Sequence, residues 1–220
     1  MTSKSFTNSA GIALPLAVIE TIRQHRDYLS ELDGAAGDGD HGINMAKGMN
    51  RALARIEEAD SANLTTGFAA ISDVLLSEIG GSMGPLYGGF FRGVSVASRT
   101  LDHIDGPAFG LLIEEGVKRI RRVSEAQVGD KTLIDVLSPA TIAYDQALLD
   151  DSGFDGALNA MEAAAAKGLE STKGMVAKIG RSSRLGERSR GHLDAGAASC
   201  TLILTAMGGA AKQLLENGQN

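Results

Sequence analysis

Three aspartates lie close together in a glycine-rich segment of the chain. Asp33, Asp38 and Asp40 fall within eight residues, and four glycines lie among and just after them. Glycine lets the backbone fold back, so carboxylate oxygens at this spacing can converge on one centre. Carboxylate oxygens are the ligands that Mg²⁺ and Ca²⁺ prefer, and Mg²⁺ usually adds water and substrate phosphates. The segment Asp33–Asn44 therefore predicts a divalent metal site, with Mg²⁺ held against the phosphates of a nucleotide.

The same segment also has a simpler interpretation. Asp40 would only cap the following helix, and Asp33 and Asp38 would be solvated turn residues. An EF-hand fits worse, because the twelfth position of the loop is Asn44 rather than glutamate. His41 alone is more typical of a structural residue. Its place beside two carboxylates, at the start of a helix whose amides would face an anion, favours a functional role.

A second glycine-rich segment, Gly80–Gly89, contains Ser82 and places Pro85 at a plausible first position of a helix. Exposed amides and a hydroxyl at a helix N-terminus suit phosphate oxygens. The segment is not a Walker loop, because no Gly-Lys-Ser/Thr sequence follows. A tight turn between two helices is an equally good interpretation of this segment alone.

Two later segments complete the set. In Gly129–Asp135 the simplest interpretation is that Asp130 or Thr132 caps the next helix. The segment Gly180–Ala197 contains four arginines, whose planar guanidinium groups can bind phosphates bidentately, although a run of charge is usually a solvated face. Together, the aspartate segment, the glycine-rich segment and the arginine-containing segment predict a site for a polyphosphate. Phosphoryl transfer requires a positioned substrate, a metal ion and positive charge that stabilises the transferred group.

The elements that must position these segments are predicted to be helices. Apolar residues recur at helical spacing almost throughout, whereas no stretch alternates long enough to predict a strand. The connections are short, which favours antiparallel neighbours in an up-and-down bundle of about eight helices. We predict one all-α domain over residues 1–220. The predicted helices have apolar faces at Ile12 to Leu32, Met45 to Ile56 and Phe68 to Ile79, or span about Leu86–Leu101, Ala108–Val123, Lys131–Leu149, Phe154–Ile179 and Ala195–Leu215.

Composition narrows the class of protein. The chain has 220 residues, of which 43% are hydrophobic, enough for a packed core. Its net charge of −6 and the absence of a long basic run argue against a nucleic-acid partner. The single Cys200 cannot form an internal disulfide, and no apolar run approaches 18 residues. We therefore expect a soluble cytoplasmic protein without a membrane partner; a homodimer is compatible with these features.

Read in order, the four segments resemble those of the nucleotide-binding domain of the dihydroxyacetone kinase family. The resemblance covers the whole chain. It rests on the aspartate spacing followed by His-Gly-x-Asn-Met, and on Gly-Gly-Ser-x-Gly-Pro-Leu-Tyr, Gly-Asp-Lys-Thr-x-x-Asp and Gly-Arg-x-Ser-x-Leu-Gly-Glu-Arg-Ser-x-Gly-His-x-Asp. It implies a barrel of eight antiparallel helices with the nucleotide, ADP or ATP, at one end. It also implies that Asp33, Asp38 and Asp40 ligate two Mg²⁺ ions.

The resemblance further implies roles for the remaining site residues. Leu133 stands near the base, and Arg181 supplies a cationic contact. Three departures from the family pattern are present: Met83 replaces a common Ser, so only its backbone N–H would serve; Ala195 replaces Pro; and Ser183–Arg184 replaces Ser-Tyr. The implied nucleotide contacts are His41, Gly42, Asn44, Ser82, Met83, Leu133 and Arg181, with Asp194 and Ala195 closing the pocket.

In this family a histidine of a separate subunit or domain holds the sugar covalently. None of the chain's histidines (His25, His41, His103, His192) is assigned that role, so a sugar-binding kinase subunit is the expected partner. Either ADP stays bound and a phosphohistidine carrier protein rephosphorylates it, or ATP exchanges at each turnover. The acceptor would be dihydroxyacetone or another short ketose. The alternatives are a nucleotide-bound regulatory module without turnover and, less well supported, a metal-dependent phosphohydrolase.

Overall fold

The computed structural model describes residues 4–218, and its core is built from helices. Each long helix turns an apolar face inward, so aliphatic side chains such as Leu14, Met49 and Leu75 are fully buried. No helix in the described part of the chain is both long and apolar enough to cross a membrane. The helices are α1 (Ala13–Gln24), α2 (Arg26–Ala36), α3 (His41–Glu57), α4 (Leu64–Glu78), α5 (Gly89–Ser98), α6 (Gly106–Arg121), α7 (Ile134–Leu149), α8 (Gly153–Thr172) and α9 (Ala195–Asn217).

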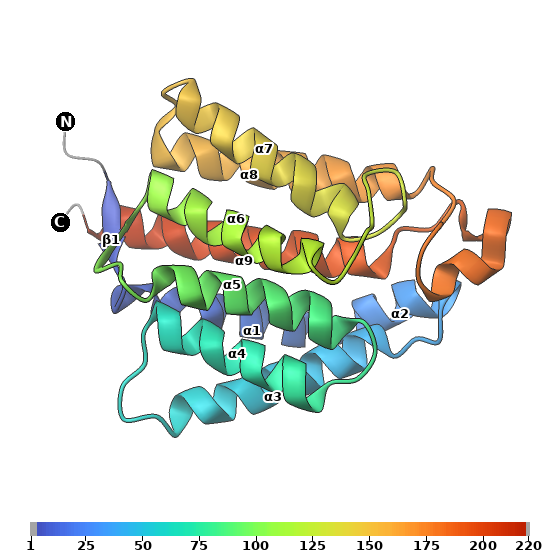
Figure 1. Cartoon of the computed structure of the whole chain (residues 1–220), viewed down its shortest axis with the longest axis horizontal. Helices are drawn as coiled ribbons and strands as arrows, with labels where there is room; N and C mark the ends of the chain where they lie inside the picture. Colours follow the sequence, from blue (N-terminus) through green and yellow to red (C-terminus); the bar gives the residue numbers. More distant parts are fainter. Residues whose placement is uncertain (1–3, 219–220) are drawn as a thin grey trace.

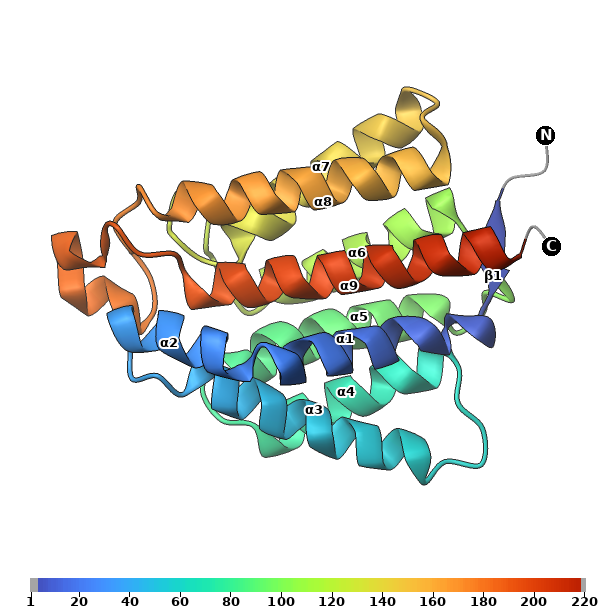
Figure 2. The same ribbon diagram turned by 180° about the vertical axis from the view of Figure 1, so that it is seen from behind.

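The helices run up and down and close into a barrel (Figures 1 and 2). From α3 to α9 each helix packs against the next, and α9 packs against α1. Because the direction alternates, the connections α2–α3, α4–α5, α6–α7 and α8–α9 all lie at one end, on the right of Figure 1. Strand β1 and the last turn of α9 lie at the opposite end. This topology explains how four segments far apart in sequence reach the same place, and it confirms the predicted all-α bundle.

A two-stranded antiparallel sheet lies at the end of the barrel opposite these four connections. Strand β1 (Ser5–Thr7) pairs with β2 (His103–Asp105), with Phe6 opposite Ile104. The Phe6 ring also packs on Phe154, with ring centroids 6.3 Å apart. The sequence did not predict these strands, because three residues are too few to show an alternating pattern.

Several predicted helix boundaries were wrong. The first predicted helix is divided at His25, whose backbone leaves the helical region at φ −98° and ψ 15°. The helix predicted from about Leu86 begins as α5 at Gly89. A short π-helix, η2 (Gly84–Gly88), precedes it and has Pro85 in its first turn, as expected. Helix α8 ends at Thr172 rather than Ile179. A 3₁₀ segment, η3 (Arg181–Ser189), kinks at Gly186 within the expected arginine loop.

Candidate functional site

A cavity of about 870 Å³ opens at the end of the barrel where the four connections meet. Eleven of the twelve predicted site residues line it: Asp33, Asp38, Asp40, His41, Asn44, Ser82, Met83, Leu133, Arg181, Asp194 and Ala195. Gly42 does not. A Cβ at Gly42 would lie 1.9 Å from the Arg26 carbonyl oxygen, so this glycine lets α3 pack closely against α2. Its predicted contact with the nucleotide stays a prediction.

The three predicted metal ligands converge. One carboxylate oxygen from each of Asp33, Asp38 and Asp40 lies within 4.8 Å of the others. Asp33 belongs to the last turn of α2, Asp38 to the connection, and Asp40 directly precedes α3. Two glycines make this possible: Gly39 turns the chain at φ +77°, and a Cβ at Gly37 would lie 2.5 Å from an Asp33 carboxylate oxygen. An all-oxygen set of ligands matches the preference of Mg²⁺, so these residues fit the ion.

The capping interpretation of this segment finds no support in the side-chain contacts. Asp40 occupies the N-cap position of α3, but its side chain accepts no capping hydrogen bond. Asp33 instead reaches across and accepts a hydrogen bond from the His41 N–H at 3.3 Å. The Asp38 and Asp40 carboxylates therefore keep their oxygens directed to the cavity.

Arg181 faces the same carboxylates from the other side of the cavity. Its guanidinium forms an ion pair with Asp38, and the distance to Asp40 is 3.6 Å. All three side chains are about half exposed, with 54% for Arg181, 50% for Asp38 and 43% for Asp40. Ion pairs as exposed as these contribute at most about 1 kcal/mol. The contact is therefore weak enough to be exchanged for a ligand.

His41 belongs to a buried polar chain behind the metal ligands. Its Nε2 lies 2.9 Å from the Ser199 hydroxyl, which lies 2.6 Å from the Tyr87 hydroxyl. Tyr87 also lies within donating distance, 2.7 Å, of the Gly196 carbonyl. Burial lowers the pKa of His41, and the negative charge of Asp33 partly offsets this effect. Burial thus favours the neutral form of the imidazole, and Ser199 of α9 and Tyr87 of η2 orient it.

The second and third segments also line the cavity. Ser82 is exposed at the cavity, whereas the Met83 side chain is only 8% exposed and packs in the core. In the third segment Thr132 accepts a hydrogen bond from the Ile134 N–H at 3.1 Å, but the N-cap residue of α7 is Leu133, so neither Asp130 nor Thr132 occupies the predicted cap position. The buried Asp135 carboxylate accepts hydrogen bonds from two backbone amides, those of Gly129 and Thr132. This segment is therefore a fixed wall of the cavity.

Asp194 begins the last helix at the edge of the cavity. Its carboxylate caps α9 by accepting a hydrogen bond from the Ala197 N–H at 2.7 Å. Burial raises the pKa of Asp194 to about 6, and this hydrogen bond and the Lys131 charge act in the opposite direction. The residue is thus both a structural cap and an ionisable group beside the predicted site.

Three residues near the site were not predicted from the sequence: Tyr87, Lys131 and Ser199. Tyr87 and Lys131 line the cavity, and Ser199 orients His41. Tyr87 lies within the second segment and Lys131 within the third, but the pattern of these segments indicates no role for either side chain. Ser199 lies within α9, where no neighbouring motif indicates a function.

Comparison with known proteins gives consistent results. Residues 35–209 match the DAK2 domain. The chain is 40% identical over 188 residues to the ADP-binding subunit of PEP-dependent dihydroxyacetone kinase 1 from Listeria innocua, a match that covers 86% of this chain and 89% of that one. It is 38% identical over 185 residues to the ADP-binding subunit of the PTS-dependent dihydroxyacetone kinase from Lactococcus lactis, covering 84% and 88% of the two chains.

A solved structure also has the same fold. It is the dihydroxyacetone kinase from C. freundii in complex with AMP-PNP and Mg²⁺, with a TM-score of 0.62 and 25% identity. The match covers 91% of this chain but 33% of that larger one. The likeness thus concerns one part of the larger kinase.

Proposed function

Because the chain belongs to the DAK2 domain family, we propose that it is the nucleotide-binding, phosphate-donating subunit of a dihydroxyacetone-type kinase. Similarity to ADP-binding subunits over most of both chains supports this proposal. The observation that carries it is the convergence of three carboxylates and one arginine in a single cavity.

Asp33, Asp38 and Asp40 are proposed to hold magnesium, with two ions as the family resemblance implies. Bound there, the metal would neutralise charge on the phosphate oxygens of ADP or ATP. The solved relative that binds AMP-PNP and Mg²⁺ supports this assignment. The Asp38 and Asp40 carboxylates suit the role because they are accessible and, among the described residues, form a weak ion pair with only one cation, Arg181.

The remaining residues are proposed to bind and orient the nucleotide. Backbone amides at the start of α3 and at residues 82–83 would donate hydrogen bonds to phosphate oxygens. His41, held neutral, would offer its second ring nitrogen to the same oxygens. Leu133, which is 5% exposed, would form an apolar contact with the base. Arg181 would leave the carboxylates and stabilise charge on the transferred phosphoryl group.

The acceptor is proposed to be a short ketose held by a separate sugar-binding subunit, which would dock in the cytoplasm over the end of the barrel where the cavity opens. Names of the two similar subunits, PEP-dependent and PTS-dependent, favour bound ADP that a phosphohistidine carrier protein rephosphorylates. Exchange of ATP at each turnover is the second mode. Dihydroxyacetone is the first substrate to test, and a tetrulose the second.

A reconstituted transfer assay tests the proposal. The chain is combined with a sugar-binding subunit of a dihydroxyacetone kinase, with dihydroxyacetone or erythrulose, and with either ATP or a phosphorylated carrier protein. We expect the sugar phosphate to form only when both subunits and Mg²⁺ are present. Failure to phosphorylate either sugar with either donor, while ADP still binds, would contradict the kinase function and favour a regulatory module. Steady phosphate release by the chain alone would favour a phosphohydrolase.

A further inference from the structure

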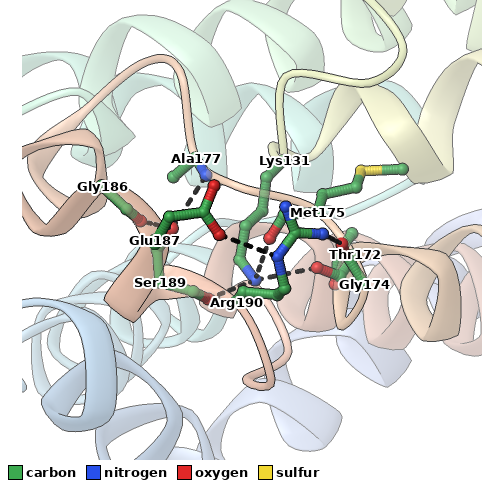
Figure 3. Close-up of polar contacts among 9 residues, drawn as sticks. All are labelled: Lys131, Thr172, Gly174, Met175, Ala177, Gly186, Glu187, Ser189 and Arg190. Atoms are coloured by element: carbon green, nitrogen blue, oxygen red, sulfur yellow. Dashed lines mark hydrogen bonds and ion pairs between the residues drawn. The ribbon is translucent and has the colours of Figure 1, made fainter.

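Lys131 is a buried lysine at the edge of the candidate nucleotide cavity. Its side chain is 1% exposed, and its backbone adopts a left-handed conformation at φ +62°. The ammonium donates hydrogen bonds to the carbonyl oxygens of Thr172 at 2.8 Å, Ser189 at 2.7 Å and His192 at 2.6 Å. The Met175 carbonyl lies at 3.3 Å. Figure 3 shows the side chain extending from its own loop toward Thr172, Met175 and Ser189.

The hydrogen-bond capacity of Lys131 is therefore used up within the protein. An ammonium has three N–H donors, and three short bonds occupy all of them. A lysine beside a phosphate site is usually interpreted as a phosphate ligand. Here no N–H remains for a phosphate, so the function of Lys131 must be exerted through the segments that it joins.

Three of the four carbonyls belong to the segment that carries Arg181, and the fourth, that of Thr172, lies directly before it. Thr172 ends α8, Ser189 ends η3, and Met175 and His192 lie in the connections that follow these two elements. Carbonyls at the end of a helix have no partner within that helix, and a cation there interacts favourably with its dipole. One side chain thus closes two helical ends and ties residues 173–193, which we call the arginine segment, to the α6–α7 connection.

Other contacts stabilise the arginine segment from within. The Ser189 hydroxyl accepts a hydrogen bond from the Ala177 N–H at 2.9 Å and donates to the Gly186 carbonyl at 2.6 Å. Arg190 pairs with Glu187 at 3.0 Å. These contacts are also visible in Figure 3. They fix the shape of the segment, whereas Lys131 supplies a buried attachment to the wall of the barrel.

We propose that Lys131 is a positioning residue: it holds the arginine segment over the cavity so that Arg181 reaches the phosphate site, and it does not bind the nucleotide. The role in transfer rests on the proposed function, but the structural role does not. Burial lowers the pKa of Lys131, and the nearby Asp194 carboxylate opposes that effect, which helps to keep the ammonium charged in place.

Hydrogen exchange of the full-length protein tests the structural role. Lys131→Met keeps the length of the side chain but removes its charge and donors. We expect amides of the arginine segment to exchange about tenfold faster or more in this variant, with unchanged protection in α4 and α5. Lys173→Met is the matched control, because Lys173 lies in the same segment but is 58% exposed and pairs with Glu170 of α8 rather than with the α6–α7 connection. It should leave the exchange pattern unchanged.

Kinetics with the sugar-binding subunit test the role in transfer. In Lys131→Met we expect kcat to fall by about tenfold or more while the dissociation constant for Mg-ADP changes less than about threefold. Lys131→Gln, which keeps two N–H donors, should be intermediate in both exchange and kcat, and it serves as the test if the methionine variant does not fold.

Two results would overturn the inference. One is wild-type exchange in the arginine segment of a folded Lys131 variant. The other is an equal loss of Mg-ADP affinity and transfer, which would make Lys131 a ligand of the nucleotide. If the wild-type chain binds no Mg-ADP at all, the proposed function fails, but the exchange experiment still decides the structural role of Lys131.

Discussion

Charged side chains lie at two walls of the cavity, but they are exposed at one wall and buried at the other. On the wall formed by α2 and α3, the Asp38 and Asp40 carboxylates are about half exposed, and their only ion-pair partner among residues 4–218 is Arg181. Behind the wall formed by the α6–α7 connection, Asp135 in the first turn of α7 is 1% exposed, and its carboxylate accepts hydrogen bonds from two backbone amides. Lys131 on that wall is equally buried and bound to carbonyls.

The difference separates residues that can take a ligand from residues that hold the site together. A buried charge is retained only if it is paired through hydrogen bonds. Asp135 is therefore inaccessible to a substrate, and the three N–H donors of Lys131 are already used. Exposed carboxylates such as Asp38 and Asp40 can exchange a weak ion pair for a metal ion. Accessibility and unused hydrogen-bond capacity, rather than residue type, mark the wall where chemistry is expected.

Removing a carboxylate from the exposed wall should have the largest effect. Asp38→Ala and Asp40→Ala should each lower the Mg²⁺-dependent affinity for ADP about 1,000-fold, the effect of losing a unit charge about 4 Å from a cation at intermediate dielectric. Circular dichroism should remain that of the wild type. Calorimetry measures the affinity, and Asp27→Ala, on the same helix pair but 87% exposed and away from the cavity, is the control. Wild-type affinity in either variant would remove the metal assignment.

Arg181→Ala should separate binding from transfer. Loss of a guanidinium that stabilises the transferred group should lower the rate of sugar phosphorylation about 100-fold, whereas the ADP affinity should change less than about threefold. Initial rates with the sugar-binding subunit and an ADP titration measure the two quantities. Arg188→Ala, an exposed arginine of the same segment, is the matched control. A transfer rate equal to that of the wild type would place the cationic contact elsewhere.

The pH dependence of stability should reveal the ionisation of Asp194. Its folded pKa of about 6 lies above the ordinary value of 3.8, so the folded protein holds this proton more tightly. Raising the pH from about 4.5 to 6.5 should therefore lower the free energy of unfolding, by up to about 2 kcal/mol from this group. Asp194→Asn, whose side chain still caps α9, should lose that part of the slope in urea titrations. An unchanged slope would mean that Asp194 is not perturbed.

Met83→Ser should have the smallest effect on nucleotide affinity. Because the Met83 side chain packs in the core, only its backbone N–H can face a phosphate. The variant should lose about 1–3 kcal/mol of stability and change the ADP affinity less than about threefold. Thermal unfolding and calorimetry measure the two effects. A tenfold gain in affinity would show that a side chain at this position reaches the ligand.

The sequence was sufficient to predict most of the fold, because helix formation depends on local apolar spacing. It failed at His25, where that spacing continues from Ile19 to Leu29 although the backbone breaks. It also missed the end of α8 at Thr172, because apolar and small residues continue beyond it. Boundaries of this kind are decided by tertiary packing rather than by local pattern.

The candidate site was predicted where a motif carries its own chemistry, as for Asp33, Asp38 and Asp40. The roles of Lys131 and Ser199 could not be predicted. The carbonyl partners of Lys131 lie 41 to 61 residues away, and Ser199 lies 158 residues from His41. A hydrogen bond over such a separation leaves no pattern within one sequence.

The central claim is that the exposed wall binds a nucleotide through magnesium. The most direct test is a calorimetric titration of the wild-type chain with ADP, first with Mg²⁺ and then with EDTA. We predict tight binding with Mg²⁺ and a loss of about 100-fold or more when the metal is removed. Equal affinity in the two titrations, or no binding in either, would contradict the account.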